Sequence, residues 1–237
     1  MRHGKRIGVV IPALNEEGAI SRVIAAIPDW VDEIAVADNG SSDRTAMAAE
    51  VAGAHVTIEP LRGYGAACQA GIKALPPVDI VVFLDGDYSD YPEDMHLLVD
   101  PILANNADFV VGSRVLGRIE KGALTPQQRF GNWLACRLMR RFFGTEFTDL
   151  GPFRAIRAGA LDALDMHDRA FGWTVEMQIK AARAGLAIRE VPVRYRPRIG
   201  VSKISGTVRG TLLAGFTILN VIVRSALSRT PNRCPQG

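Results

Sequence analysis

Short apolar runs alternate with helical patterns over the first 112 residues, and this alternation constrains the fold more than any other feature of the chain. The apolar runs are rich in β-branched residues, and the segments between them repeat apolar residues at helical spacing. Such an order predicts a parallel sheet with crossover helices. We therefore expect an α/β fold with a doubly wound, mostly parallel, Rossmann-like sheet and helices on both faces. The ligand site should lie at the carboxyl ends of the strands.

The expected strands cover residues 6–11, 33–38, 55–58, 79–85 and 107–112, and the expected crossover helices cover 20–27, 43–53, 63–74 and 92–104. After Gly112 the pattern changes, and we expect a mixed C-terminal subregion. It should contain helices over 126–143 and 158–164, a helix after Gly172, an antiparallel or edge strand over 186–195, and a final apolar helix over about 206–227.

A chain of 237 residues can bury one substantial core. We expect a single domain over 1–205, made of two halves over 1–112 and 113–205, with an apolar helix and tail over 206–237. Three cysteines are too few for a disulfide framework and suit a reducing cytosol. The first residues lack a signal-peptide pattern, so we expect a cytoplasmic protein.

The net charge of +3 conceals a division between the two halves. Residues 1–110 hold 7 Lys and Arg against 17 Asp and Glu, whereas residues 111–237 hold 21 against 8. We expect the first half to meet a metal or cationic groups and the second to meet phosphates or anionic lipid, unless both are ordinary solvated surface. Nucleic acid is not an expected partner, because the arginines are dispersed with little aromatic surface between them.

The C-terminal apolar run leaves two interpretations open. The 14 residues between Arg209 and Arg224, about 21 Å of helix, fall short of a bilayer core of roughly 30 Å. The basic residues from Arg194 to Arg209 precede this run, which suits a helix lying on an anionic membrane surface at the inner face of the membrane. A core helix or a homodimer contact explains the apolar residues equally well.

Two carboxylates two residues apart follow the predicted strand 79–85. Asp85 and Asp87 point to one side if the strand geometry continues, and Gly86 between them lets a ligand approach the backbone. Two hard oxygen ligands at a strand end can share Mg²⁺ or Mn²⁺, which substrate phosphates then complete. The plainer alternative is a turn rich in Asp and Gly.

Three other polar loops should converge on the same edge of the sheet. Their candidate substrate-binding residues are Pro12, Asn15 and Glu16 in the first loop, Asp38, Ser41 and Asp43 in the second, and Arg62, Gly63 and Gly65 in the third. The glycines permit close backbone approach at a helix N-terminus, and Arg62 offers charge to a phosphate. For the first two loops, helix capping by Asn15 and by Ser42 or Asp43 is the structural alternative.

Taken in order, these four loops resemble those of the family 2 glycosyltransferases, inverting nucleotide-sugar enzymes of the GT-A fold. The similarity continues more loosely to about residue 205, through the segments 112–114, 148–154, 190–193 and 198–203, which are similar to those of dolichyl- and polyprenyl-phosphate sugar synthases. Asn39 departs from the pattern, because a second Asp is frequent there. The Gln-x-x-Arg-Trp motif of processive synthases is missing from the sequence, which argues against chain polymerisation.

The resemblance implies that residues 1–112 form the nucleotide-sugar and metal half and that residues 113–205, the mixed subregion, form the acceptor half. It also implies a role for several residues. Asp38 would contact the base, Asp85 the ribose or metal, and Asp87 the metal on the diphosphate. A hydroxyl acceptor would need a general base, for which Glu176 and Asp149 are eligible, although a charge near a helix N-terminus and a turn residue explain them equally well. A phosphate acceptor would need no base. Its expected cradle comprises Arg154, Arg196, Arg198 and Lys203, and Ser202 is a further candidate substrate-binding residue.

We expect a metal-dependent glycosyltransferase that moves a hexose from a UDP or GDP sugar to an acceptor, first of all a polyprenyl phosphate. One alternative is transfer to a soluble or lipid hydroxyl group. Another is a non-catalytic protein that binds a nucleotide sugar. A nucleotidyltransferase would need a glycine-rich phosphate loop after the first strand, and residues 12–15 do not form one.

Overall fold

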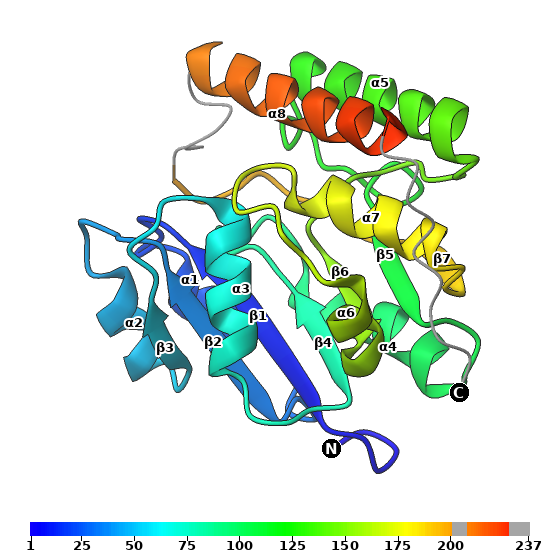
Figure 1. The fold of residues 1–237 in the computed structure, drawn as a ribbon. Helices are drawn as coiled ribbons and strands as arrows, with labels where there is room; N and C mark the ends of the chain where they lie inside the picture. The colour runs from blue at the N-terminus through cyan, green and yellow to red at the C-terminus, as the bar shows by residue number, and fades with distance from the viewer. Residues whose placement is uncertain (201–207, 228–237) are drawn as a thin grey trace.

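The computed structural model describes residues 1–200 and 208–227, which form a seven-stranded sheet between helices (Figure 1). The strands are β1 (Ile7–Ala13), β2 (Glu33–Asp38), β3 (His55–Ile58), β4 (Ile80–Phe83), β5 (Phe109–Ser113), β6 (Arg154–Arg157) and β7 (Ile188–Pro192). Their order across the sheet is β3-β2-β1-β4-β6-β5-β7. β6 runs antiparallel to β4 and β5, and the other neighbours are parallel.

Helices cover both faces of this sheet. They are α1 (Ile20–Ala25), α2 (Thr45–Val51), α3 (Tyr64–Ala74), α4 (Met95–Leu103), α5 (Pro126–Phe143), α6 (Ala158–Leu164), α7 (Trp173–Arg183) and α8 (Val208–Leu227), with a 3-10 turn over Pro92–Asp94. One core cluster joins the sheet to α1, α2 and α4, and another joins its opposite face to α3, α6 and α7. Successive residues of β5 enter opposite clusters, because side chains alternate along a strand.

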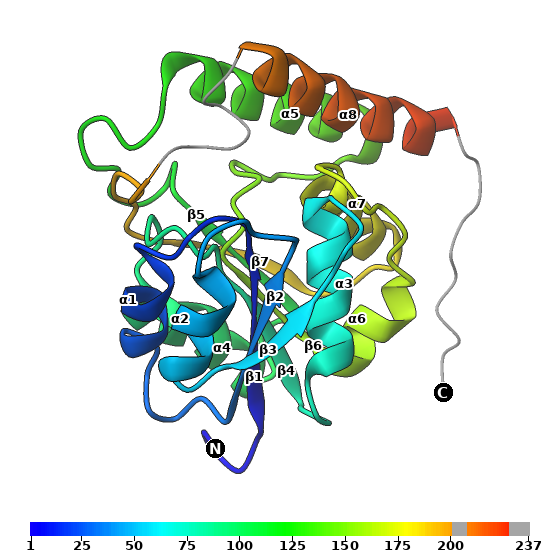
Figure 2. The ribbon, with the colours of Figure 1, turned by 90° about the vertical axis from the view of Figure 1, so that its left-hand side faces the viewer.

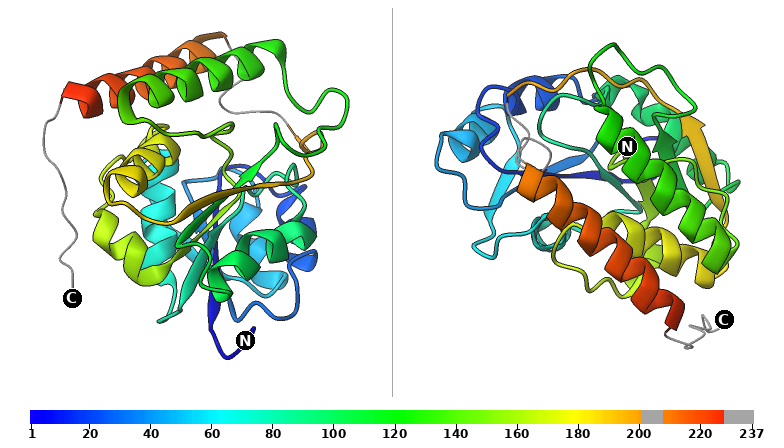
Figure 3. Two further views of the ribbon diagram at one scale, coloured as in Figure 1. Left: turned by 90° about the vertical axis from the view of Figure 1, so that its right-hand side faces the viewer. Right: turned by 90° about the horizontal axis from the view of Figure 1, so that it is seen from above.

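A further layer of two helices lies beyond α7. α5 and α8 run side by side above the rest of the domain (Figures 2 and 3), and both pack against α7 and against each other. Ala135 and Met139 of α5 and Ile222 of α8 enter the core cluster of α7. Among the helices that the structure describes, none is both long and apolar enough to span a membrane.

The predicted α/β sheet with helices on both faces is confirmed, with three local corrections. The strand 186–195 is β7 at the sheet edge, as one alternative expected, but it is parallel to β5, so the antiparallel alternative is wrong. β6 was not predicted. The capping role considered for Asn15 is also wrong, because α1 begins at Ile20 and Asn15 instead has φ of +53° and accepts from Ser42 N.

The strand order brings the site together. β1, β2 and β4 are parallel, so the loops that follow them meet at one edge. The segment after β7 returns to this edge, where Arg196 N donates to Ser89 O at 2.9 Å and Ile199 N donates to Asp87 O at 2.9 Å. The C-terminal half of the domain thereby reaches the acidic loop after β4.

Candidate active site

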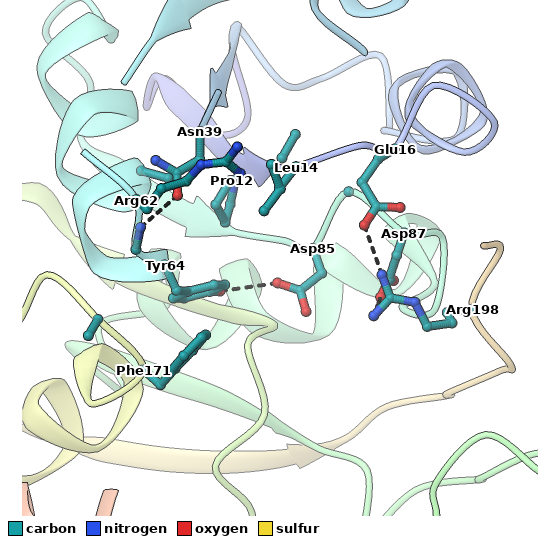
Figure 4. A pocket seen from close by; sticks show the side chains of 15 residues that line it. Pro12, Leu14, Glu16, Asn39, Arg62, Tyr64, Asp85, Asp87, Phe171 and Arg198 are labelled. Atoms are coloured by element: carbon teal, nitrogen blue, oxygen red, sulfur yellow. Dashed lines mark hydrogen bonds and ion pairs between the residues drawn. The ribbon is translucent and has the colours of Figure 1, made fainter. Parts of the chain in front are cut away.

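A pocket of about 350 Å³ lies at this edge of the sheet (Figure 4). The expected site residues that line it are Pro12, Glu16, Arg62, Gly63, Asp85, Gly86, Asp87 and Arg198. The other lining residues are Ala13, Leu14, Asn39, Tyr64, Ala67, Ala170 and Phe171. All four loops that the sequence analysis singled out therefore contribute to one cavity, together with the basic segment near residue 198.

The two carboxylates after β4 face this pocket with different partners. Tyr64 Oη donates to Asp85 Oδ1 at 3.1 Å, and Ser89 N donates to Asp87 Oδ1 at 2.8 Å. Burial raises the pKa of Asp85 to about 7, and the neighbouring Asp87 charge adds to the rise. Burial and the charge of Asp85 also hold the pKa of Tyr64 well above its ordinary value. The phenol therefore stays protonated and donates a hydrogen bond to Asp85.

This carboxylate pair fits a divalent cation. Across residues 1–200 and 208–227, no cluster of three His, Cys, Asp or Glu side chains is arranged to hold a metal ion. Asp85 and Asp87 would therefore supply two oxygen ligands, and the remaining positions would fall to diphosphate oxygens and water, as is usual for Mg²⁺. A cation held by the two carboxylates would also offset their mutual repulsion, which adds to the effect of burial in raising the pKa of Asp85.

Arg198 carries a positive charge into the same pocket. Its Nη2 donates to Glu16 Oε1 at 2.8 Å, and its Nη1 lies 3.2 Å from Asp87 Oδ2. The bond from Ile199 N to Asp87 O fixes the adjacent backbone. A guanidinium held beside the proposed metal ligands can meet the diphosphate of a nucleotide sugar.

Asn39 braces the loop that carries Arg62. Its Nδ2 donates to the carbonyls of Glu59 and Leu61, at 3.0 and 2.7 Å, and its Oδ1 accepts from Gly63 N at 2.7 Å. An aspartate has no N–H and could not make the two donations. The local hydrogen bonds therefore explain why Asn39, and not the Asp that is frequent in the family, fits this position.

The glycines before and within α3 serve a packing role. A Cβ on Gly63 would lie 2.0 Å from Arg169 O, and one on Gly65 would lie 2.1 Å from Asp168 O. Gly65 N and Ala66 N donate to the carbonyls of Ala170 and Arg169, at 3.1 and 3.0 Å. The backbone of segment 168–170 therefore lies against these glycines, where a phosphate was expected. This docking brings Ala170 and Phe171 to the pocket.

Several expected residues of the first two loops form hydrogen bonds within or between these loops and do not line the pocket. Asn15 N donates to Ser41 Oγ at 2.9 Å, and Ser41 N donates to Asp38 Oδ1 at 2.6 Å. Asp43 Oδ1 accepts from Thr45 N at 3.0 Å, at the start of α2. The contact of Asp38 with a base stays a prediction.

The two candidate bases lie outside the pocket lining. Asp149 accepts from Arg114 through the backbone N, Nε and Nη2, at 2.8, 2.7 and 2.6 Å. Glu176 accepts from His167 N and Asp168 N, at 3.1 and 2.7 Å, and pairs with Lys180 Nζ at 2.8 Å. Glu176 therefore anchors the segment that docks on α3.

The expected phosphate cradle is only partly assembled. Arg154 is buried, and its guanidinium donates to the carbonyls of Leu150, Gly151 and Thr174. Arg196 donates to the carbonyls of Tyr88 and Asp90, at 2.7 and 3.1 Å. Arg198 lines the pocket, whereas Ser202 and Lys203 lie outside the described residues.

Tyr64 and Phe171 are the pocket residues with the largest side chains that sequence reasoning missed. Tyr64 stands inside the Arg-Gly-Tyr-Gly segment, so its position beside the glycines was an available signal. No local pattern indicates Phe171, because its place depends on the docking of segment 168–170 against α3.

Comparison with known proteins decides the family. The sequence model of glycosyl transferase family 2 matches residues 8–165, which is more than half of the chain. The chain belongs to glycosyl transferase family 2. This glycosyltransferase is 38% identical over 221 residues to an uncharacterized glycosyltransferase of Mycobacterium tuberculosis, covering 92% of this chain and 99% of the relative. It is 30% identical over 230 residues to undecaprenyl-phosphate mannosyltransferase of Micrococcus luteus, covering 90% and 93%.

A solved structure of similar fold contains a metal and a nucleotide. Glucosyl-3-phosphoglycerate synthase from Mycobacterium tuberculosis, in complex with Mn²⁺, UDP and glucosyl-3-phosphoglycerate, superposes with a TM-score of 0.75 at 26% identity. The match covers 94% of this glycosyltransferase and 80% of that chain. The expected family and GT-A fold are thereby confirmed, and the similarity to polyprenyl-phosphate enzymes has a named relative.

Proposed function

We propose that this glycosyltransferase moves a hexose from a UDP or GDP sugar to a polyprenyl phosphate, with a divalent cation held by Asp85 and Asp87. The pocket supports donor binding, because its carboxylate pair suits a cation and Arg62 and Arg198 suit a diphosphate. The similar structure holds Mn²⁺ and UDP, which favours a UDP sugar as the first donor to test.

The residues around the pocket would have different roles in sugar transfer. A bound cation supplies positive charge that stabilises the departing nucleoside diphosphate. Asp85 and Asp87 would hold it, and the phenol of Tyr64 orients Asp85 through the 3.1 Å hydrogen bond. Arg198 would exchange its contact with Asp87 for diphosphate oxygens, so that charge developing on the leaving group meets a fixed cation.

One observation carries the choice of a phosphate acceptor over a hydroxyl acceptor. Both candidate bases, Asp149 and Glu176, lie outside the pocket lining, with carboxylate oxygens engaged by Arg114 or by backbone N–H groups. Beside Asp85 and Asp87, the only acidic side chain among the described lining residues is Glu16, which is paired with Arg198. A phosphate oxygen is already anionic and attacks the anomeric carbon without a base.

The direct test is transfer from radiolabelled UDP-glucose and GDP-mannose to undecaprenyl phosphate, to undecaprenol and to 3-phosphoglycerate, each with Mn²⁺ or EDTA. We expect metal-dependent product only with undecaprenyl phosphate. Asp87→Asn should abolish it while preserving the melting temperature, and exposed Asp29→Asn is the matched control. Transfer to undecaprenol or to 3-phosphoglycerate, but not to the lipid phosphate, would overturn the acceptor assignment.

A further inference from the structure

α5 and α8 present their outer sides away from the domain. Their inner sides, with Ala135 and Met139 on α5 and Ile222 on α8, pack into the core cluster of α7. The two helices run side by side as the outermost layer of the molecule (Figures 2 and 3). The opposite sides of both helices are therefore left to face outward together.

These outer sides carry large apolar residues at helical spacing. On α5, the side chains of Phe130 and Trp133 are 62% and 54% exposed, with ring centroids 5.8 Å apart. On α8, Phe216, Val223 and Leu227 follow one another at intervals of seven and four residues, and Phe216 and Leu227 are 68% and 77% exposed. Positions at these intervals share one face of a helix.

The same layer is basic and contains no acidic residue. The 38 residues of α5 and α8 include six arginines and no Asp or Glu. On α5, Arg129, Arg137, Arg140 and Arg141 are all exposed, and Arg137 lies over the Trp133 ring at 5.8 Å from its centroid. A second copy of this chain would bring like charges against this face, so self-association through it is disfavoured.

We propose that this outer face of α5 and α8, defined by Phe130, Trp133, Arg137, Phe216 and Leu227, binds the surface of an anionic lipid bilayer. Apolar and aromatic side chains would enter the headgroup boundary while the arginines meet lipid phosphates. The inference deepens the proposed function, since an acceptor anchored in lipid requires the enzyme to meet a membrane. Vesicle binding can be measured independently of sugar transfer.

The structure changes where the membrane contact is expected. From the sequence, the candidate contact is the basic stretch from Arg194 to Arg209 together with the final apolar helix. In the structure, Arg194 is paired with Asp94 at 2.6 Å, Arg196 is stacked on Tyr88, and Arg198 is in the pocket. The exposed arginines of α5 supply the charge instead, and α8 begins ten residues after Arg198.

The test is sedimentation of the full chain with vesicles of phosphatidylglycerol and phosphatidylcholine, or of phosphatidylcholine alone. We expect binding to the anionic vesicles that weakens as salt rises. Phe130→Ser with Trp133→Ser should lower the affinity at least tenfold. Arg137→Gln with Arg141→Gln should lower it about 25-fold, from about fivefold for each arginine. Exposed Arg22→Gln on α1 and exposed Met47→Ser on α2 are the matched controls.

Two readouts separate this proposal from the proposed function. The α5 variants should keep the wild-type melting temperature and the wild-type affinity for nucleotide with Mn²⁺, whereas Asp87→Asn should lose metal binding and keep vesicle binding. Equal affinity of wild type and α5 variants for anionic vesicles would overturn the assignment of this face. If the wild type binds no vesicles and sedimentation equilibrium shows a wild-type dimer that the Phe130→Ser, Trp133→Ser variant loses, the face would be assigned to a second copy of the chain.

Discussion

Replacing Asp149 with alanine tests whether this residue is a structural anchor or the general base of a hydroxyl acceptor. Its side chain is 1% exposed and receives three hydrogen bonds from Arg114, whose side chain is 14% exposed. Burial disfavours the charged guanidinium, but the charge and hydrogen bonds of Asp149 hold the pKa of Arg114 well above its ordinary value. Without Asp149, this buried cation would lose its main partner.

Removing one member of a buried ion pair costs about 3–5 kcal/mol, because the other charge stays buried without compensation. In a domain of this size, each kcal/mol lowers the melting temperature by about 2–4 °C. Asp149→Ala should therefore lower the melting temperature by about 6–20 °C. The paired variant with Arg114→Met should recover part of the loss, since it removes the uncompensated charge.

Differential scanning calorimetry measures the change, with Asp29→Ala as the control for loss of an exposed carboxylate. Binding of UDP with Mn²⁺, measured at 15 °C where the variant is folded, should stay within a few-fold of wild type. An Asp149→Ala protein that melts like wild type and binds donor normally, yet loses transfer to a hydroxyl acceptor, would refute the structural role and restore Asp149 as a base.

Three further predictions concern the pocket and the segment 168–170 that docks beside it. Asp85 has a pKa of about 7 and must lose its proton to bind a cation. The affinity for Mn²⁺, measured by calorimetry, should therefore rise about tenfold per pH unit up to pH 7 and level off above it. A flat affinity profile from pH 5 to 8 would contradict this. Arg198→Gln should weaken UDP-glucose binding about tenfold yet tighten binding of Mn²⁺ alone, because the guanidinium competes for Asp87; weaker Mn²⁺ binding would show that Arg198 does not compete. Gly65→Ala should destabilise the fold by about 1–3 kcal/mol in urea unfolding, since the new Cβ meets Asp168 O at 2.1 Å, and an unchanged midpoint would mean that segment 168–170 yields freely.

Most of the fold could be predicted because its strands are marked locally. The runs of β1 and β4 are continuous and apolar, and β2 contains the apolar run 34–37, as expected for strands buried on both faces. β6 was not predicted because its apolar run is only two residues long and lies between Arg154 and Arg157. Its insertion between β4 and β5 rests on pairing with distant strands, which no local pattern encodes.

The site was predictable to the level of its loops, and less so to the level of side chains. Parallel strands bring their carboxyl ends to one edge, so the convergence of the four loops followed from the strand order. The alternation at the end of β2 then favours Asn39 over Asp38 as a lining residue, because adjacent side chains point to opposite sides. The place of Phe171 depends on tertiary docking and left no trace in the sequence.

The charge division between the two halves acquires two meanings in the structure. Arginines of the second half such as Arg114, Arg154 and Arg194 are held by carboxylates or backbone carbonyls within the fold, so they cannot all serve a substrate phosphate. Four exposed arginines, Arg129, Arg137, Arg140 and Arg141, lie together on α5, away from these partners, and Arg137 lies over the ring of Trp133. The basic excess therefore stabilises the second half of the chain internally and leaves a separate cationic face outside. Arg62 and Arg198 are the only Lys or Arg side chains among the described residues that line the pocket. With a lipid phosphate as acceptor, the arginines of α5 would contact the bilayer that holds the lipid. Arg62 and Arg198 would lie near its reacting phosphate oxygen in the pocket.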